Sequence, residues 1–208
     1  RGCGIGDNHI RFSLNDVLLS DKNINQAIIS TDFGFSIFPS TPELTESEVK
    51  LVSLDEKEFH LKSAILRTDA DYDYALIDCP PSLNILTVSS LTASNSLLIP
   101  VQCEFFALQG LSELVNTVES IVASSNPSLS IKGIVRTMYD PRNNLSEDVS
   151  DQLKKHFKQK LYKTKIPRNI TLAESPSHGL PVLQYDSHSK GAISYMSLAG
   201  EILKQENS

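Results

Sequence analysis

The sequence predicts an α/β fold in which a doubly wound, mostly parallel sheet is flanked by helices. From residue 83 onward, patterns typical of helices alternate with patterns typical of strands, which indicates βαβ units. A short apolar run, Tyr74–Ile77, ends in Asp78 and is stopped by two prolines, as expected for a buried parallel strand. No repeat, low-complexity stretch or Gly/Ser linker divides the chain, so we expect a single domain over residues 1–208.

The apolar periodicity places the elements in order along the chain. The predicted helices after the first strand cover residues 83–93, 108–123, 147–161 and 192–204. The predicted strands cover residues 74–77, 96–101 and 131–137. Nearer the start we expect short helices at 14–19, 25–29, from 42 onward and up to 67, around one strand at 35–38. In the last helix one apolar stripe predicts packing on the sheet: Ile193, Met196, Ala199 and Leu203.

Composition excludes several classes of protein. With 19 Lys and Arg against 25 Asp and Glu, the net charge is −6, so the chain is no general polycation and nucleic acid would need a local basic patch. Three widely spaced cysteines predict neither a disulfide framework nor a zinc site, and they favour the cytosol. No apolar run approaches the ~20 residues of a membrane span. We therefore expect a cytoplasmic protein that does not enter the membrane.

Catalytic motifs of several enzyme classes are absent from the sequence. There is no G-x-x-x-x-G-K-[ST] phosphate-binding loop, and Gly2-Cys3-Gly4-Ile5-Gly6 follows no strand and precedes no Lys-Ser/Thr. Neither G-x-S-x-G nor H-E-x-x-H occurs, so serine-hydrolase and zinc-protease chemistry have no support.

Asp78 is the first candidate for chemistry. Open α/β sheets bind ligands at the carboxyl ends of their strands, and a carboxylate in that position is how a Walker B aspartate orients Mg²⁺. The alternative is an ordinary turn aspartate before two prolines.

A basic segment is the second candidate. Residues 152–171 hold seven of the basic residues and none of the acidic ones, which indicates an anionic partner such as DNA. The alternative is a solvated helix face. Val149, Leu153 and Phe157 would bury one stripe of the helix. The lysines at 154, 155 and 158 would then face water, as both interpretations predict: Lys154, Lys155 and Lys158.

Three longer stretches carry a resemblance to a known family. Across residues 72–203 they read D-Y-A-L-I-D-C-P-P-S-L, L-I-P-V-Q-C-E-F-F-A-L-Q-G-L and K-I-P-R-N-I-T-L-A-E-S-P-S-H-G. These motifs resemble those of the ParA/Soj partition ATPases, and Arg1–Gly6 is similar to the stretch that follows the family's early D-P-Q-G-N-A-T segment. The resemblance implies a P-loop NTPase-like fold. It also implies that the family's first strand, its K-G-G-x-G-K-T loop and its first switch aspartate would lie before Arg1, which predicts a fragment unable to hydrolyse ATP.

The resemblance implies nucleotide-site roles for particular positions. Asp78 matches the Walker B carboxylate, the metal ligand and catalytic residue, and Cys79–Ser82, with Pro80, matches the second switch. Glu104 and Phe105 fall near the nucleotide and the dimer face. Three further residues match segments that line the adenine pocket: Met138, Pro167 and Arg168.

The resemblance implies that Lys158 and the region of His188 and Lys190 correspond to basic positions that contact DNA in the family. Here the sequence departs from the family, because residues 186–191 read D-S-H-S-K-G where the family usually has D-P-R-S-R-G. An always-charged arginine is thereby replaced by His188, which weakens the DNA assignment. With the helix lysines, the predicted DNA contacts are Lys154, Lys155, Lys158, His188 and Lys190.

For the complete protein, the resemblance implies ATP and Mg²⁺ as cofactors, a homodimer, non-specific DNA binding on the nucleoid, and a ParB-type partner that stimulates hydrolysis. Two alternatives stay open. A MinD-like membrane-associated ATPase would need a basic amphipathic C-terminal helix, but residues 193–208 hold a single base, Lys204. A non-enzymatic remnant that pairs with ParB or a full-length ParA would suit the absent loop.

Overall fold

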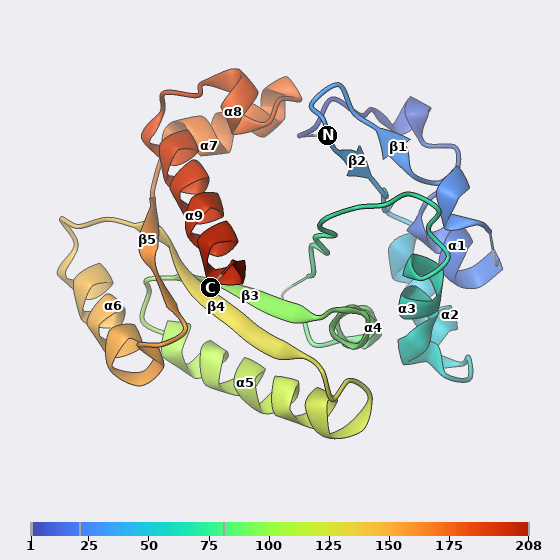
Figure 1. Ribbon diagram of the computed structural model, residues 1–208, viewed down its shortest axis with the longest axis horizontal. Helices are drawn as coiled ribbons and strands as arrows, with labels where there is room; N and C mark the ends of the chain where they lie inside the picture. The colour runs from blue at the N-terminus through green and yellow to red at the C-terminus, as the bar shows by residue number, and fades with distance from the viewer. Residues whose placement is uncertain (1, 21, 81, 208) are drawn as a thin grey trace. The chain divides into compact units, whose positions relative to one another are not determined.

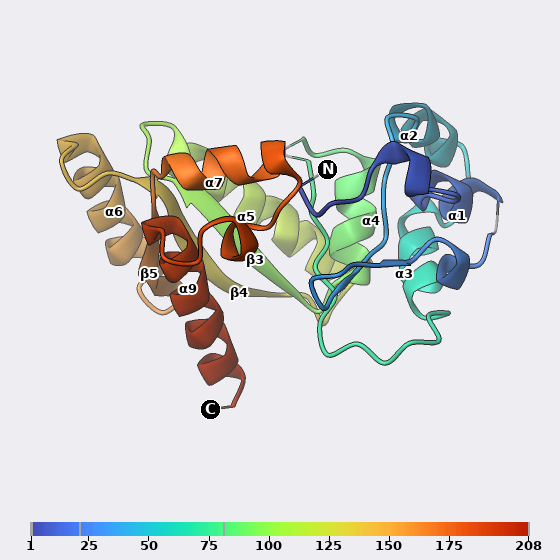
Figure 2. The ribbon, with the colours of Figure 1, turned by 90° about the horizontal axis from the view of Figure 1, so that it is seen from above.

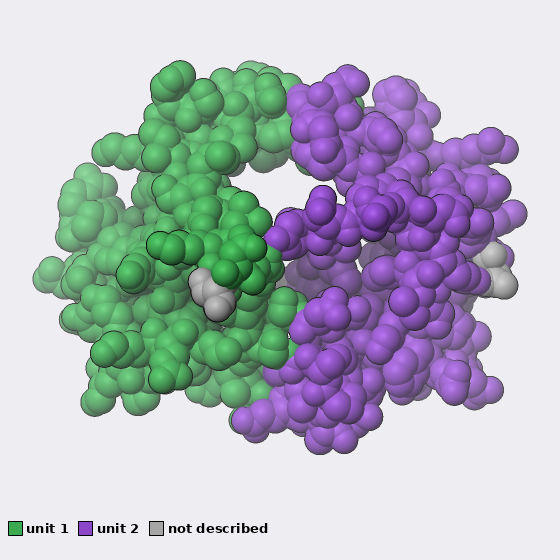
Figure 3. Space-filling model, in the orientation of Figure 1, with its two compact units in different colours: residues 1–4, 96–117, 130–208 green, residues 5–95, 118–129 purple. Residues whose placement is uncertain are grey.

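The computed structural model describes residues 2–20, 22–80 and 82–207. Arg1 and Pro81, which the sequence analysis places in family segments, lie outside the described residues. The chain divides into two compact units, coloured separately in Figure 3. Unit 1 holds residues 1–4, 96–117 and 130–208, and unit 2 holds residues 5–95 and 118–129.

Unit 1 is built on a parallel sheet of three strands in the order β3-β4-β5 (Figure 1). These strands are β3 (Ser96–Gln102), β4 (Ser130–Tyr139) and β5 (Leu161–Pro167). The central strand pairs Ile134 with Ile99 of β3, and its last residue, Tyr139, with Pro167 of β5. All three carboxyl ends therefore meet at one edge of the sheet, which we call the carboxyl edge; the opposite end is the amino edge.

Helices cover both faces of this sheet (Figures 1 and 2). Adjacent residues of a strand point to opposite faces. Ile134 packs in one cluster with residues of α5 (Ala107–Ser124) and α6 (Asn144–Phe157), whereas Val135 packs with Leu198 of α9 (Lys190–Glu206). Short elements connect β5 to α9: α7 (Ile170–Glu174), η4 (Ser175–His178) and α8 (Val182–Tyr185). The predicted α/β fold, a parallel sheet between helices, is confirmed.

Unit 2 is mainly helical. Its helices are η1 (Asp7–His9), α1 (Leu14–Ser20), η2 (Ile24–Gln26), α2 (Leu44–Val52), η3 (Lys57–Phe59), α3 (His60–Ile65) and α4 (Ile85–Ala93). A two-residue antiparallel pair joins β1 (Ile29–Ser30) to β2 (Ser36–Ile37). Leu18, Leu51 and Leu61 bring α1, α2 and α3 together in one apolar cluster. Among the described residues, no helix is both long enough and apolar enough to cross a lipid bilayer.

The strand predicted at residues 74–77 is wrong. This run has no regular structure, and the side chain of Leu76 is 93% exposed. No strand of the described residues pairs with it, and an extended run without a partner has no ladder to satisfy its backbone groups.

The helix predicted at residues 147–161 is correct in its centre and wrong at both ends. It begins at Asn144, because the side chain of Asn143 accepts a hydrogen bond from the backbone N–H of Leu145 and caps the helix. It ends at Phe157, and Leu161 belongs instead to β5, which the sequence analysis did not recognise as a strand.

The stripe predicted to pack α9 on the sheet is also wrong. Ile193, Met196 and Leu203 are each about half exposed, whereas Ala192 and Leu198 are buried. Polar contacts select the packed face: Glu201 on that face accepts hydrogen bonds from two backbone N–H groups of β5, those of Lys163 and Thr164. Periodicity identified a helix, and these contacts determined its rotation.

Candidate functional site at the carboxyl edge and a basic helix

The carboxyl edge of unit 1 gathers four of the residues predicted to bind nucleotide. Glu104 follows β3, Met138 lies near the end of β4, Pro167 ends β5, and Arg168 follows it. The backbone N–H of Arg168 donates to the carbonyl of Tyr139 at 3.2 Å, which ties the ends of β4 and β5 together. Ligands of open α/β sheets bind at this edge.

Met138 has the backbone and side-chain properties of a ligand contact. Its φ of +50° lies in the left-handed region, which is costly for a residue with a side chain, and such strain is concentrated at binding sites. The side chain is 38% exposed, so its apolar thioether is accessible at the edge. The side chain of Arg168 is also exposed. The carboxyl edge therefore presents an accessible apolar surface and a cation.

Glu104 opens a short turn between β3 and α5, and its side chain is exposed. The two residues that follow, Phe105 and Phe106, are each 73% exposed and pack edge to face, with ring centroids 5.1 Å apart. The turn therefore presents an acidic and aromatic surface beside the carboxyl edge.

A polar network lies beneath the carboxyl edge, between β4, β5 and α6. The hydroxyl of Tyr139 donates to the carboxylate of Glu147, and this bond raises the pKa of Tyr139 to about 12. The ammonium of Lys165 lies 3.7 Å from the centroid of the Tyr139 ring, and burial lowers the pKa of Lys165. The network fixes the end of β4 immediately after Met138.

Arg136 is the central buried cation of that network and was missed by the sequence analysis. It is 3% exposed and donates to the hydroxyl of Ser150 on α6 at 3.0 Å. It also donates to two carbonyls of β5, those of Tyr162 at 2.6 Å and Lys163 at 3.2 Å. These bonds occur where the β4–β5 register is irregular. The available signal was a charged residue, Arg136, inside the predicted strand at residues 131–137.

Asp78 and Pro80 belong to unit 2, and both lie exposed in the irregular segment that leads to α4. Mg²⁺ is commonly held by one or two carboxylates together with phosphate oxygens and water, and an exposed Asp78 carboxylate suits that donor set. In the part of the chain that the structure describes, no group of three or more His, Cys, Asp or Glu could enclose a metal by itself. The carboxylate of Asp78 therefore fits a metal ion whose other ligands are phosphate oxygens of a nucleotide and water.

The predicted basic surface on α6 is exposed, as expected from its periodicity. Val149 and Leu153 are buried, whereas Lys154, Lys155 and Lys158 face water. Lys154 is bound to Asp151 on the same helix at 2.7 Å, so its charge is partly offset by an acid just outside the acid-free segment. Lys155 and Lys158 form no ion pair within the described residues.

His188 and Lys190 are exposed at the start of α9. The side chain of Ser189 caps this helix by accepting from the N–H of Ala192. Helix α6 ends where β5 begins, at the amino edge, whereas α9 starts after β5 has ended at the carboxyl edge. The α6 lysines and the pair His188 and Lys190 therefore belong to opposite ends of unit 1 (Figure 1). The structure does not bring them together.

Comparison with known proteins identifies the family. The AAA domain family matches residues 1–131. The Myxococcus xanthus chromosome partitioning protein ParA is 41% identical over 99% of this chain and 73% of its own length. The Bacillus subtilis sporulation initiation inhibitor protein Soj is 44% identical over 97% of this chain and 80% of its own length.

Solved structures show the same fold. The cobyrinic acid a,c-diamide synthase of Mycobacterium smegmatis, with bound ATP analog and magnesium, matches with a TM-score of 0.82 and 31% identity, over 99% of this chain and 77% of that chain. The cell division ATPase MinD of Pyrococcus furiosus, at 23% identity, matches with a TM-score of 0.76 over 98% of this chain and 80% of its own, which concerns the fold alone. The 41–44% identity to the two partition proteins over nearly the whole chain shows that the chain belongs to the ParA/Soj family of chromosome-partitioning ATPases.

Proposed function

We propose that this protein is a DNA-partitioning ATPase that binds ATP with Mg²⁺, forms a homodimer, binds DNA without regard to base sequence, and responds to a ParB-type partner on the nucleoid. In this proposal both units serve one nucleotide-binding domain. The observation that carries it is the 41–44% identity to ParA and Soj proteins over nearly the whole chain.

In the nucleotide site, Asp78 would hold Mg²⁺, Pro80 would belong to the switch that relays the nucleotide state, and Glu104 would lie near the nucleotide. Met138, Pro167 and Arg168 would contact the base. Their common position at the carboxyl edge supports the last three assignments. When bound, Mg²⁺ would neutralise charge on the phosphates.

DNA binding would depend chiefly on Lys155 and Lys158, with Lys154, His188 and Lys190 as further candidates. Lysines contact phosphates as point charges and read no base edges, which suits a partner of any sequence. The exposure of Lys155 and Lys158, and the lack of an ion pair for either within the described residues, support this assignment.

The test is the DNA affinity of the variant Lys155→Glu/Lys158→Glu, in the protein expressed from its complete gene, with ATP and Mg²⁺ present. If both lysines touch phosphate, the slope of log affinity against log salt should flatten by about 1.8, equally for any duplex sequence. ATP binding should be unchanged.

The matched control is Lys50→Glu/Lys62→Glu, which changes the net charge equally on α2 and α3 of unit 2. Parental affinity and salt slope in the α6 variant would show that these lysines are only a solvated helix face. Equal losses in both variants would indicate a general charge effect and would also contradict the assignment.

A further inference from the structure

Tyr139, the last residue of β4, is attached to each of the three residues that the proposed function places on the base. It follows Met138 in the chain, and it pairs with Pro167 across the β4–β5 ladder. Its backbone carbonyl accepts a hydrogen bond from the N–H of Arg168 at 3.2 Å. A displacement of Tyr139 would therefore disturb all three residues at once.

The side chain of Tyr139 is held by contacts with two other elements. It is 8% exposed and belongs to the same apolar cluster as Val149 and Leu153 of α6. Its hydroxyl donates to the carboxylate of Glu147 in the first turn of α6, and a hydrogen bond to a charged group is stronger than one between neutral groups. The ammonium of Lys165, on β5, lies 3.7 Å from the centroid of the ring. The position of this side chain is therefore fixed by both α6 and β5.

Met138 requires an anchor of this kind. Its φ of +50° is unfavourable for a residue with a side chain, and such a conformation persists only where the surrounding structure enforces it. The Met138 side chain is 38% exposed, so its own packing provides little of that constraint. Two residues earlier, Arg136 is hydrogen-bonded to α6 and β5, and one residue later Tyr139 is hydrogen-bonded to α6. The strained residue is therefore held from both sides by its neighbours in β4.

We propose that Tyr139 is a positioning residue for recognition of the base, because its hydrogen bond to Glu147 holds Met138 and Arg168 in the arrangement that contacts the nucleotide. The proposal rests on the proposed function, which places those residues on the base, and it adds Tyr139 and Glu147 to the residues that determine nucleotide affinity. Neither of the two added side chains touches the nucleotide in this proposal. Their effect is therefore confined to the part of the affinity that the base supplies.

The test compares ATP with inorganic tripolyphosphate, which has the phosphates but no base. Both are measured by displacement of a fluorescent ATP analogue, with Mg²⁺ present, from the protein expressed from its complete gene. Tyr139→Phe should weaken ATP binding roughly tenfold, the scale of one hydrogen bond to a charged group, and should leave the affinity for tripolyphosphate unchanged. Equal weakening of both ligands would show that the substitution disturbs the whole site, and it would contradict the proposal.

Variants of Glu147 test the same hydrogen bond from its other partner, and this residue is exposed, so the fold tolerates its replacement. Glu147→Ala should weaken ATP binding as much as Tyr139→Phe does. Glu147→Gln keeps an oxygen that accepts from the tyrosine hydroxyl, so ATP affinity should stay close to the parental value. The double variant Tyr139→Phe/Glu147→Ala should be no weaker than either single variant, because both remove one bond. Additive losses would show that the two side chains act separately, which would overturn the proposal.

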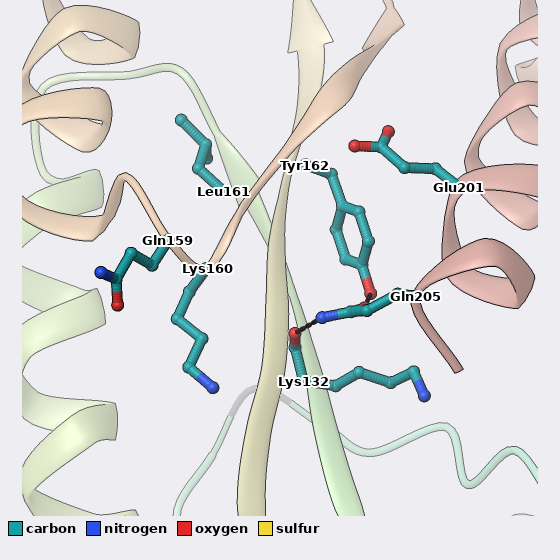
Figure 4. A pocket seen from close by; sticks show the side chains of 7 residues that line it. All are labelled: Lys132, Gln159, Lys160, Leu161, Tyr162, Glu201 and Gln205. Carbon is teal, nitrogen blue, oxygen red and sulfur yellow. Dashed lines mark hydrogen bonds between the residues drawn. The ribbon is translucent and has the colours of Figure 1, made fainter. Parts of the chain in front are cut away.

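Tyr162 provides the matched control, because it is also a buried tyrosine of the sheet whose hydroxyl bonds to a helix. It is 5% exposed, and its hydroxyl donates to Gln205 of α9 at 2.8 Å (Figure 4). It lies near the start of β5, at the amino edge, whereas Tyr139 ends β4 at the carboxyl edge. Tyr162→Phe removes the same oxygen atom and should leave the affinity for ATP unchanged. Equal losses of ATP affinity in the two phenylalanine variants would indicate a general loosening of unit 1 and would contradict the proposal.

The remaining outcomes separate this proposal from the proposed function. If the parental protein binds no ATP, the proposed function fails. If the parental protein binds ATP and Tyr139→Phe binds it equally well, the positioning role alone fails. If tripolyphosphate does not displace the analogue from the parental protein, the base and the phosphates are not recognised separately, and the positioning role fails in that case too.

Discussion

Residues 130–139 and residues 74–77 are both rich in apolar side chains, and each run is followed by an aspartate, yet only the first forms a strand. β4 is paired on both sides, by β3 and by β5, and Ile134 at its centre is fully buried. In residues 72–80 no pairing occurs within the described chain, and Leu76 is 93% exposed. The difference shows that apolar composition provides the side chains of a strand, whereas a neighbouring strand provides the hydrogen bonds that keep it extended.

The largest effect expected from this comparison concerns the two aspartates. If Asp78 holds Mg²⁺, Asp78→Ala should lower Mg²⁺-dependent ATP turnover by roughly a hundredfold or more, because a metal contributes several kcal/mol of charge stabilisation. Asp140→Ala, after β4, should leave turnover within about twofold. Both are measured by phosphate release from the protein expressed from its complete gene. Equal turnover in the two variants would remove Asp78 from the site.

An intermediate effect concerns the two apolar side chains. Ile134→Ala should lower the free energy of unfolding by about 2–5 kcal/mol, because it leaves a cavity in the sheet. Leu76→Ala should change it by less than about 0.5 kcal/mol, because that side chain is already in water. Urea denaturation followed by circular dichroism measures both. A cost above about 1 kcal/mol for Leu76→Ala would show that residues 72–80 are packed in solution.

The smallest effect concerns the carboxylate that follows β4. The guanidinium and backbone N–H of Arg142 donate to Asp140 and lower its pKa from 3.8 to about 2. Because the folded pKa is depressed, this pair contributes stability above pH 4 and loses it as the pH falls toward 2. Arg142→Gln should raise the Asp140 pKa toward its ordinary value, as measured by carboxyl NMR titration. An unchanged titration would mean that the pair does not persist in solution.

Much of unit 1 was predictable because its signals are local. The alternating apolar runs identified β3, β4 and α5 to within two residues, and the spacing of Val149 and Leu153 identified the buried face of α6. The start of α6 was placed three residues late, because capping by Asn143 is a side-chain contact that apolar periodicity does not register.

The features that sequence analysis missed depend on contacts between distant residues. β5 was not predicted, because its alternating lysines were grouped into the acid-free basic segment of residues 152–171, although pairing with β4 makes it a strand. The rotation of α9 depends on Glu201 meeting the amides of Lys163 and Thr164, which lie 37 or more residues away. Near the carboxyl edge, the buried Arg136 could not be recognised from the sequence, because its hydrogen-bond partners lie 14 to 27 residues away.

The Lys163 peptide is held from both sides, since its N–H donates to Glu201 and its carbonyl accepts from Arg136. β5 is an edge strand of the sheet, and open edges invite pairing with strands of other molecules and hence aggregation. With the amides of Lys163 and Thr164 already occupied and the Lys163 side chain exposed, this stretch offers few free groups to an incoming strand. The contacts that orient α9 thereby also protect the β5 edge of the sheet against pairing with other molecules at high local concentration.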